Sequence, residues 1–325
     1  MNSTPQPKPL ASKARGPASS NGSDRLPLVS VVTAALDPPL DRLARCIGSV
    51  KAQSYPRIEH VVVDGGSTNG ALDLLAEHPH IRWQSEPDRG QSDAVNKGFF
   101  ERSTGDLIVW LNADDVLYEG SVGEAVEHFR EDPSLGWVYG NLDVDRRGHK
   151  HVIRPPSRAS LPELDFNNVG LIAPGTMFAR WALETVGRLD ESLNMEMDLD
   201  LSIRLLQAGI RSRHIPRSLA LLEIYDGTKS GEVPKRDIVI ERHRIYLKHG
   251  MFQQAGAALA LAGRYELFDE IEDALRDGRF RDASAAAKTG LRFMPSIFAR
   301  HRISFWITRF FPRAMLAFKR ARHRL

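Results

Sequence analysis

The segment DLIVWLNADD, residues 106–115, carries the strongest signal for the fold and places unusual charge beside it. Its five consecutive apolar residues, 107–111, are typical of a strand that is buried on both faces of a parallel sheet. The strand runs directly into Asn112, an alanine, and the two carboxylates Asp114 and Asp115. Adjacent carboxylates repel each other and lose hydration when they are covered, so their position at the end of a buried strand needs an explanation.

Similar segments precede this strand, and they alternate between two kinds of pattern. Strands are predicted at 28–35, 58–66, 81–86 and 106–111, and helices at 39–54, 71–78 and 92–103. Apolar runs without alternation, separated by helices, indicate a mostly parallel sheet with helices on both faces. The order β-α-β-α-β-α-β therefore predicts a doubly wound α/β fold.

The rest of the chain suggests an extension rather than a second sheet domain. A helix at 121–132, a strand at 136–144 and helices at 180–191 and 198–209 are expected, and the chain reads as helical from about residue 236. We expect a disordered leader at 1–27, a main α/β domain at 28–235 and a helical C-terminal extension at 236–325. The leader lacks an apolar core, so it is not a secretory signal.

Composition and charge limit the kinds of function that fit the chain. With 325 residues and 42% hydrophobic residues, the chain holds enough apolar material for one large domain with an appendage. The single cysteine, Cys46, excludes an intrachain disulfide and a cysteine-cluster metal site, and we expect it to be buried. No run of about 18 apolar residues could span a bilayer, which favours a cytoplasmic location.

The net charge of +3 is unevenly distributed along the chain. Residues 283–325 contain 10 Lys or Arg and no Asp or Glu, so the first 282 residues have 34 basic and 41 acidic side chains, a net charge of −7. The basic pI belongs to the tail and does not indicate nucleic-acid binding by the main domain. In the tail, aromatic and basic residues alternate through 291–325, which fits either a helix docked on the domain or a helix lying on an anionic membrane surface.

Polar residues gather where the predicted strands end. In sheets of this kind, ligands bind outside the carboxyl ends of the strands, which here are 33–37, 64–69, 86–91 and 112–115. Three of these four ends carry acids beside Gly, Ser or Asn. This convergence predicts a ligand site at one edge of the sheet.

The two carboxylates Asp114 and Asp115 suit a hard divalent cation, Mg²⁺ or Mn²⁺, which would also offset their mutual repulsion. The alternative is a pair of acids that opens a turn or caps the helix beginning at Ser121. Neither a P-loop nor a Gly-x-Gly-x-x-Gly fingerprint is present to supply a phosphate site instead.

Two further stretches contribute candidate ligand contacts. Asp64, next to Gly65, follows a strand and could accept hydrogen bonds from a base or a ribose, or could simply form an Asx-turn. The stretch 85–106 adds Asp88, Arg89, Gln91, Asp93, Asn96 and Lys97. Spacing places Asp93, Asn96 and Lys97 where all three can face one cleft, although either cation could instead be merely solvated.

Five stretches together resemble glycosyltransferase family 2, whose fold is called GT-A. They are VSVVTAA, VVVDGGSTNG, EPDRGQSDAVNKGF, GDLIVWLNADD and PGTMFARWALETVGRLDESLNMEMDLDLSIRL, in the family's order, from about residue 28 to about residue 230. The resemblance implies transfer of a sugar from a nucleotide diphosphate sugar, with UDP as the usual nucleotide, and inversion at the anomeric carbon. The implied acceptor is a glycan or a lipid-linked glycan, at the inner face of the plasma membrane.

The resemblance also assigns roles to residues. Asp64 matches the acid that contacts the nucleoside, and NADD matches the metal-binding motif, with Asn112 in place of its usual first acid. Asp198 matches the general base, and Glu196 is the nearest rival for that role. A later family segment normally carries an Arg and a His where Glu223 and Tyr225 stand here, which leaves Lys229 as a weak candidate contact. The implied nucleotide-sugar-binding set is Asp64, Gly65, Asp88, Arg89, Gln91, Asp93, Asn96, Lys97, Asn112, Asp114, Glu196 and Lys229, with Asp114 and Asp115 as metal ligands.

Two other functions compete with transfer. A sugar-nucleotide nucleotidyltransferase has a related α/β topology, but its glycine-rich phosphate loop is missing because VSVVTAALDPPL contains no glycine. A non-catalytic nucleotide-sugar-binding module would keep the pocket without the base. The presence of Asp198 together with Asp114 and Asp115 counts against that alternative.

Overall fold

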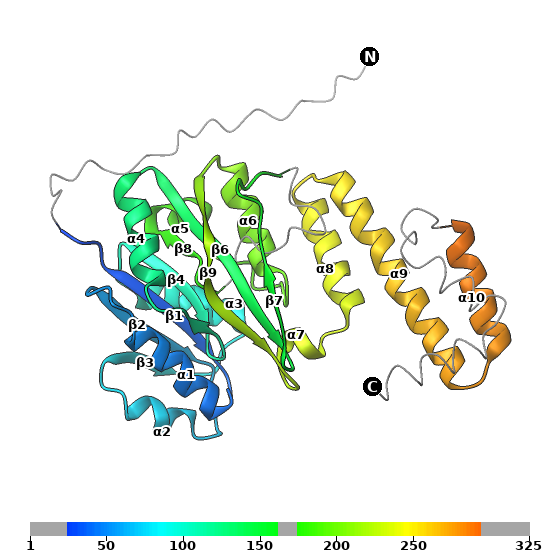
Figure 1. Cartoon of the computed structure of the whole chain (residues 1–325), viewed down its shortest axis with the longest axis horizontal. Coiled ribbons are helices and arrows are strands. Elements are labelled where there is room, and N and C mark those ends of the chain that lie inside the picture. The colour runs from blue at the N-terminus through cyan, green and yellow to red at the C-terminus, as the bar shows by residue number, and fades with distance from the viewer. Residues whose placement is uncertain (1–24, 162–173, 294–325) are drawn as a thin grey trace, which may run out of the picture. The chain divides into compact units, whose positions relative to one another are not determined.

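The computed structural model describes residues 25–161 and 174–293, which form two compact units (Figure 1). The sheet unit comprises the described residues up to 161, together with 174–192 and 200–223. The helical unit comprises 193–199 and 224–293. The expected leader at 1–27 falls largely outside the described residues, and so does most of the basic tail at 291–325.

The first half of the sheet is parallel, as predicted. Its strands follow the order β3-β2-β1-β4, and their bounds are β1 (Val29–Ala35), β2 (Ile58–Asp64), β3 (Ile81–Ser85) and β4 (Leu107–Asn112). The connecting helices are α1 (Leu40–Lys51), α2 (Ala71–Ala76) and α3 (Gln91–Lys97). In this arrangement β1 and β4 lie side by side, so their carboxyl ends meet at one edge of the sheet.

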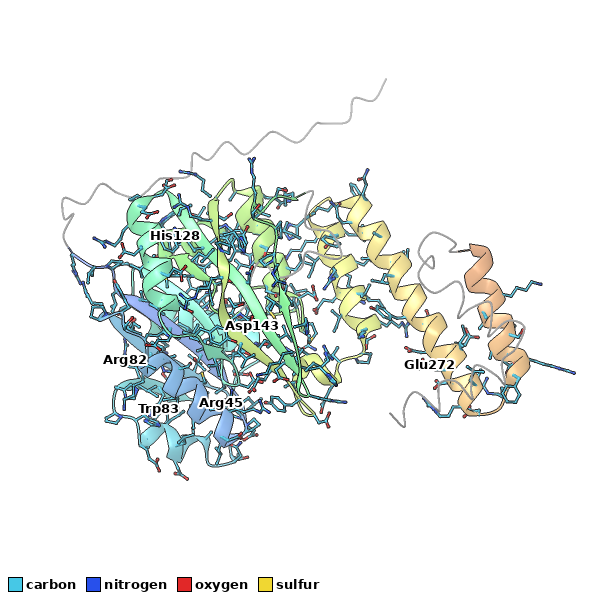
Figure 2. All side chains as sticks on the ribbon, viewed as in Figure 1. Arg45, Arg82, Trp83, His128, Asp143 and Glu272 are labelled. Carbon is cyan, nitrogen blue, oxygen red and sulfur yellow. The ribbon has the colours of Figure 1, made fainter. Side chains whose placement is uncertain are left out.

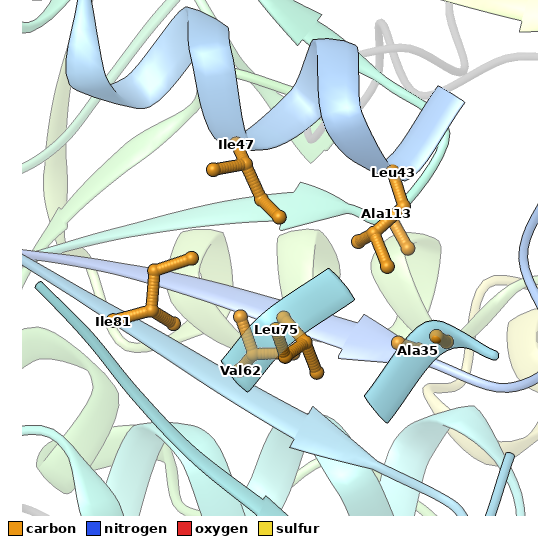
Figure 3. Packing of buried hydrophobic residues seen from close by; sticks show 8 residues of the cluster. Ala35, Leu43, Ile47, Val62, Leu75, Ile81 and Ala113 are labelled. Atoms are coloured by element: carbon orange, nitrogen blue, oxygen red, sulfur yellow. The ribbon is translucent and has the colours of Figure 1, made fainter. Parts of the chain in front are cut away.

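Apolar side chains cover both faces of the parallel half. On one face, Leu43 and Ile47 of α1 and Leu75 of α2 pack with Val62 of β2 (Figure 3). On the other face, the chain after α3 comes so close that a Cβ at Gly98 would lie 2.2 Å from a methyl carbon of Val32. Burial on both faces explains why these strands have continuous apolar runs instead of alternation.

The second half of the sheet is antiparallel, and the sequence only partly indicated it. The order continues from β4 through β8, β6 and β9 to β5, with β7 paired to β6. The bounds are β5 (Val116–Leu117), β6 (Leu135–Arg146), β7 (His149–Ile153), β8 (Met177–Ala179) and β9 (Arg211–Ile224). The predicted α/β fold class is confirmed, but β9 was not anticipated as a strand because basic and apolar residues mix in its first half.

Two of the predicted helices differ from expectation. The helix expected at 92–103 is α3 followed by a π-helix, η1 (Gly98–Arg102), and the one expected at 180–191 is the shorter α5 (Arg180–Val186). Gly187 ends α5 in the left-handed region, with φ of +79°, where a glycine carries no Cβ penalty. The helices α4 (Ser121–Glu131) and α6 (Met197–Gln207) agree with the prediction to within two residues.

The helical unit contains the expected run of helices. They are α7 (Lys229–Glu232), α8 (Lys235–Lys248), α9 (Phe252–Arg276) and α10 (Phe280–Phe293). Gly250 and Gly278, with φ of +71° and +74°, make the turns between successive long helices. No helix within the described residues has the length and apolar character needed to cross a membrane.

Candidate functional site

The acidic pair at the end of β4 is set in two different environments. Asp114 is half-buried, whereas Asp115 is fully buried, with an exposed fraction of 0%. Asp115 accepts a hydrogen bond at Oδ2 from the Asn112 amide nitrogen at 2.8 Å, but its Oδ1 has no partner among residues 25–161 and 174–293. Burial and the neighbouring Asp114 raise the pKa of the Asp115 carboxyl well above its usual value. A buried carboxylate oxygen that receives no hydrogen bond is the kind of atom that can coordinate a cation.

Asn112 has a structural reason to be an amide. Its Oδ1 accepts from Gln91 Nε2 at 2.9 Å and from the Trp110 indole N–H at 3.1 Å, while its amide nitrogen donates to Asp115. An ionised aspartate could accept but could not donate, and it would place a further negative charge beside Asp115. The departure from the family's acidic motif therefore creates a hydrogen-bonded link from α3 to the buried carboxylate. Beneath it, Cys46 is buried as predicted and its Sγ contacts the Asn112 carbonyl at 3.4 Å.

At the end of β2, the buried carboxylate of Asp64 is already surrounded by donors. It accepts from the Ser67 and Ser85 hydroxyls and from the backbone N–H groups of Gly66 and Ser67, at 2.5–3.0 Å. Burial alone would raise the pKa of Asp64, but the hydrogen bonds from Ser67, Ser85 and the backbone outweigh it and hold the pKa below its usual value. Asp64 is thus kept ionised and fixed in an Asx-turn.

Gly65 allows a second carboxylate to come close to this turn. A Cβ at Gly65 would lie 2.6 Å from Asp88 Oδ2, so any larger residue would displace that carboxylate from its position. The other oxygen of Asp88 accepts from the Gly90 N–H at 2.8 Å. The loops after β2 and β3 therefore meet at Gly65 and Asp88, two of the residues proposed from sequence.

The polar residues at the start of α3 form an ion-pair network. Asp93 pairs with Arg89 at 3.1 Å and with Lys97 at 3.3 Å, and Arg89 also pairs with Glu191 at 2.8 Å. Lys97 reaches Glu86 at 3.1 Å as well. The Arg89 contact lowers the pKa of Asp93 to about 2, so this acid remains ionised. The guanidinium of Arg89 is exposed and is the member of the network most open to a ligand.

Asn96 does not join Asp93 and Lys97 in one group. It is completely buried, donates to the Leu189 carbonyl at 3.0 Å and accepts from the Leu189 N–H at 2.8 Å. Its amide also contacts Glu191 at 3.3 Å. In this structure Asn96 anchors the chain that follows α5, and it touches the α3 network only through Glu191.

The acids near the start of α6 belong to the helical unit, and they differ from each other. Both oxygens of Glu196 accept from Arg242, at 2.9 Å from Nε and 2.7 Å from Nη2, in a buried bidentate pair. Asp198 is half-buried and its Oδ1 accepts from the Leu199 N–H at 2.8 Å. Burial and the neighbouring Glu196 raise the pKa of Asp198 to about 7, although Arg242 acts in the opposite direction.

Two candidates from the segment 219–231 fall in different units. Lys229, in the helical unit, begins α7, and burial lowers its pKa while the nearby Glu241 and Asp198 counteract that effect. Glu223, in the sheet unit, forms ion pairs with Arg42 and, at 2.7 Å, with Arg45 of α1 (Figure 2 labels Arg45). Glu223, which stands where the family segment usually has an arginine, is therefore paired with two arginines of α1.

Sequence reasoning missed several residues that shape these environments. The described structure adds Ser67, Ser85, Glu191, Glu241 and Arg242. Ser67 could have been found as a hydroxyl three residues after an Asp, a typical Asx-turn pattern. The others meet their partners across 21 to 102 residues of sequence, so no local signal marks them.

Comparisons with known proteins identify the family to which the chain belongs. Residues 30–187 match the family model described as Glycosyl transferase family 2. A Mycobacterium tuberculosis protein named uncharacterized glycosyltransferase is 32% identical over 183 residues, which cover 55% of this chain and 68% of that protein. The chain belongs to glycosyltransferase family 2. The expected family membership and glycosyltransferase activity are thereby confirmed.

Other relatives have lower sequence identity, and one of them is a much longer protein. Chondroitin synthase of Escherichia coli is 27% identical over 224 residues, which cover 67% of this chain but only 32% of that protein. A crystal structure of S. aureus TarS residues 1–349 in complex with UDP-GlcNAc gives a TM-score of 0.55 at 14% identity, covering 68% of this chain and 66% of that one. At that identity the likeness shows the fold alone, and it confirms the predicted GT-A architecture.

Proposed function

We propose that this glycosyltransferase uses a nucleotide diphosphate sugar, with a UDP-sugar as the first candidate, and inverts the anomeric carbon as it transfers the sugar to a hydroxyl. The acceptor that we propose is a glycan or a lipid-linked glycan. Support for the donor comes from the S. aureus relative in fold, whose structure holds UDP-GlcNAc. Support for the acceptor comes from the relative named chondroitin synthase. Family membership counts against a nucleotidyltransferase.

The observation that carries the proposal is the unequal state of the two acids near the start of α6. A general base needs an unprotonated carboxylate whose pKa lies near the working pH, and Asp198, with a pKa of about 7, meets that need. Glu196 is committed to Arg242 through both of its oxygens. We therefore assign to Asp198 the removal of the proton from the attacking acceptor hydroxyl.

The residues at the end of β4 fit a divalent cation. Asp115 offers a buried oxygen without a protein partner among the described residues, and Asp114 adds a second carboxylate next to it. In the part of the chain that the structure describes, no group of three or more His, Cys, Asp or Glu could hold a metal ion, so we propose that donor phosphates and water complete the coordination. Asp114 and Asp115 would hold Mg²⁺ or Mn²⁺ there, and the ion would supply positive charge to offset that of the diphosphate leaving group.

For the donor we propose the loops that follow β2 and β3. Asp64, held ionised and rigid, accepts from the nucleoside, and the exposed Arg89 meets the phosphates or the sugar. Gly65 and Asp88 shape the same loops, while Gln91 and Asn112 hold the buried carboxylate in place. The remaining members of the sequence-derived set, Asp93, Asn96, Lys97, Glu196 and Lys229, support these residues through the contacts given above.

We further propose that the enzyme works at the cytoplasmic face of the plasma membrane. The support is the composition of residues 283–325, with 10 basic and no acidic side chains, interleaved with aromatic residues. Flotation of the full chain with vesicles containing anionic lipid, compared with neutral vesicles, tests this. Binding to neither kind of vesicle would remove the membrane from the proposal and leave the transfer reaction untouched.

The central test is a screen of nucleotide sugars with Mn²⁺ or Mg²⁺, measuring release of the nucleotide diphosphate with and without glycan acceptors. Wild type should turn over one donor preferentially, and Asp198→Asn should lose transfer while it still binds that donor. Asp269→Asn, at an exposed position on α9, is the matched control. Donor binding without turnover by any variant would instead identify a non-catalytic nucleotide-sugar-binding module.

A further inference from the structure

Two consecutive residues of α8, Glu241 and Arg242, hold the segment that carries Asp198. The Glu241 carboxylate accepts three successive backbone N–H groups, those of residues 194–196, at 2.6, 2.7 and 2.8 Å. Hydrogen bonds from backbone N–H groups to an ionised carboxylate are among the stronger ones in proteins. The backbone that leads into α6 is therefore clamped just before Asp198.

Arg242 acts on the same segment through a side chain. Its guanidinium and the Glu196 carboxylate are both almost fully buried, at 7% and 8% exposure, and they are joined by two parallel hydrogen bonds. Breaking such a pair would leave an uncompensated buried charge. Both oxygens of Glu196 are thus held against Arg242 of α8, which leaves Asp198 as the acid for the role of base.

Charged groups near Asp198 in the helical unit come from three places in the chain: Glu196 and Arg242 act on the Asp198 carboxyl, Lys229 interacts with it, and Glu241 interacts with Lys229. Glu196 lies on its own segment, Lys229 on α7, and Glu241 and Arg242 on α8. The phenol of Tyr246, one turn further along α8, lies near Arg242 and influences its pKa. Glu196 favours the protonated form of Asp198, and Arg242 opposes it with a smaller effect on the pKa.

We propose that Glu241 and Arg242 are positioning residues for the general base, Glu241 by clamping the backbone before Asp198 and Arg242 by engaging Glu196 so that Asp198 takes the proton. The inference rests on the proposed function. In the step concerned, the acceptor oxygen bonds to the anomeric carbon and its proton moves to Asp198. The bond from that carbon to the diphosphate breaks, and its electron pair leaves with the diphosphate. No oxidant or further reactant is needed.

The charge part of this proposal can be tested without turnover. Wild type and each variant are compared with the same protein carrying Asp198→Asn. The pH range over which their difference in melting temperature changes, here called the melting window, shows where Asp198 ionises in the folded chain. For Arg242→Gln this window should move upward by about one pH unit or more, because a cation is lost and the Glu196 charge is exposed. For Glu196→Gln/Arg242→Gln it should return toward the wild-type position, because both charges are gone. That double variant also avoids an unpaired buried charge, which keeps the test valid if the single variant does not fold.

The catalytic part uses the best UDP-sugar of the donor screen. The acidic limb of kcat against pH should follow the melting window in each variant, whereas a merely structural role would lower kcat at every pH without moving the limb. Glu241→Ala should reduce kcat by about 10-fold with donor KM unchanged, since it frees the backbone before Asp198 but leaves donor contacts alone. Glu270→Ala, an exposed glutamate of α9, is its control.

The outcomes distinguish the roles of Arg242 and Glu241 from the assignment of Asp198 as the base. An unmoved melting window in Arg242→Gln, or a window still shifted in the double variant, would overturn the role of Arg242. A kcat of Glu241→Ala equal to wild type would overturn the role of Glu241. If the windows move as expected but Asp198→Asn keeps full transfer activity, the charge arrangement is right, and the proposed base, and with it the positioning role, is wrong.

Discussion

This glycosyltransferase has two pairs of neighbouring acids, and the buried acid of each pair has a different kind of hydrogen-bond partner. At the end of β4, Asp114 and Asp115 are adjacent, and Asp115 receives only a neutral amide, from Asn112. Near the start of α6, Glu196 and Asp198 are also close in sequence, but Glu196 receives a full positive charge from Arg242. Asp115 is thus paired with a neutral amide, whereas Glu196 is paired with an arginine.

The different partners suit different chemistry: metal binding at the end of β4 and proton acceptance near the start of α6. The buried Oδ1 of Asp115, which receives no hydrogen bond within the described residues, suits a metal ion, which would bring positive charge to this pair. At the other pair, burial and Glu196 raise the pKa of Asp198 to about 7, and Arg242 offsets only part of that effect. A proton acceptor near neutral pH is what a base requires.

Asp198→Asn should lower kcat of transfer by about 1,000-fold, within the range in which a general base contributes, while donor KM changes little. The asparagine keeps the Oδ1 atom that accepts from the Leu199 N–H, so the start of α6 should stay intact. Steady-state kinetics with the preferred donor and acceptor measure the effect. A loss of less than about tenfold would mean that another group takes the proton.

The same variant makes a prediction for stability, with its sign fixed by the direction of the pKa shift. The folded-state pKa of Asp198, about 7, lies above its ordinary value of 3.8, so the wild type binds this proton more tightly when folded. Its stability relative to Asp198→Asn should be full below about pH 4 and should decline as the pH rises through about 7. Thermal unfolding should therefore show the variant melting higher at about pH 8 and equal to wild type near pH 4. A variant that melts lower at the alkaline end would contradict burial of the charge as the cause.

At the other pair, removal of a carboxylate should act through the metal. Asp115→Asn and Asp114→Asn should each reduce turnover by about 100-fold at low metal concentration, because one of two charged ligand atoms is lost. Wild type should melt higher when Mn²⁺ and UDP are added together, and neither variant should. Asp73→Asn, at an exposed position of α2, should respond like wild type. If Asp198→Asn also lost its response to Mn²⁺ and UDP, the two pairs would not be separate in function.

Asn112→Asp tests whether the amide is part of the design at the first pair. It restores the family's usual acid but removes the donor to Asp115 and adds a third negative charge. We expect about a tenfold loss of activity at limiting Mn²⁺, in keeping with the cost of one lost hydrogen bond to a buried carboxylate. Higher Mn²⁺ should recover part of the loss. Activity above wild type would show that Asn112 is only a tolerated departure from the motif.

The sequence predicted the parallel half of the fold well because its signals are local. Continuous apolar runs marked β1, β2 and β4, and the acids at their ends were visible without any knowledge of their partners. The strand β9 was missed because an antiparallel strand with one open face mixes Arg and apolar residues, so it lacks such a run. Periodicity could not foresee the π-helix that replaces the last turns of the helix after Gln91.

The candidate site was predictable to a similar degree. Residues that act through their own neighbours, such as Asp64 with Ser67, fitted the local patterns. Asn96 was grouped with Asp93 by helical spacing, but its partner is Leu189, which lies 93 positions away. Arg242 lies 46 residues beyond Glu196, in a helix with no recognisable motif. Only the folded chain therefore shows that Arg242 pairs with the Glu196 carboxylate.

The smallest effect is expected at Asp64, a carboxylate that needs neither a metal nor an arginine because hydroxyl and backbone donors surround it. Ser85→Ala removes one hydrogen bond, at 2.6 Å, and should cost about 1 kcal/mol of unfolding free energy. Because the folded pKa of Asp64 is lowered, this stability exists above the ordinary pKa and disappears as the pH falls through the folded value. The deficit should therefore be largest near neutral pH and shrink in acid, with donor KM raised by about threefold. Chemical denaturation across pH measures it, with the exposed Ser54→Ala as the control. A deficit that is the same at every pH would mean that Ser85 contributes packing and does not stabilise the charge.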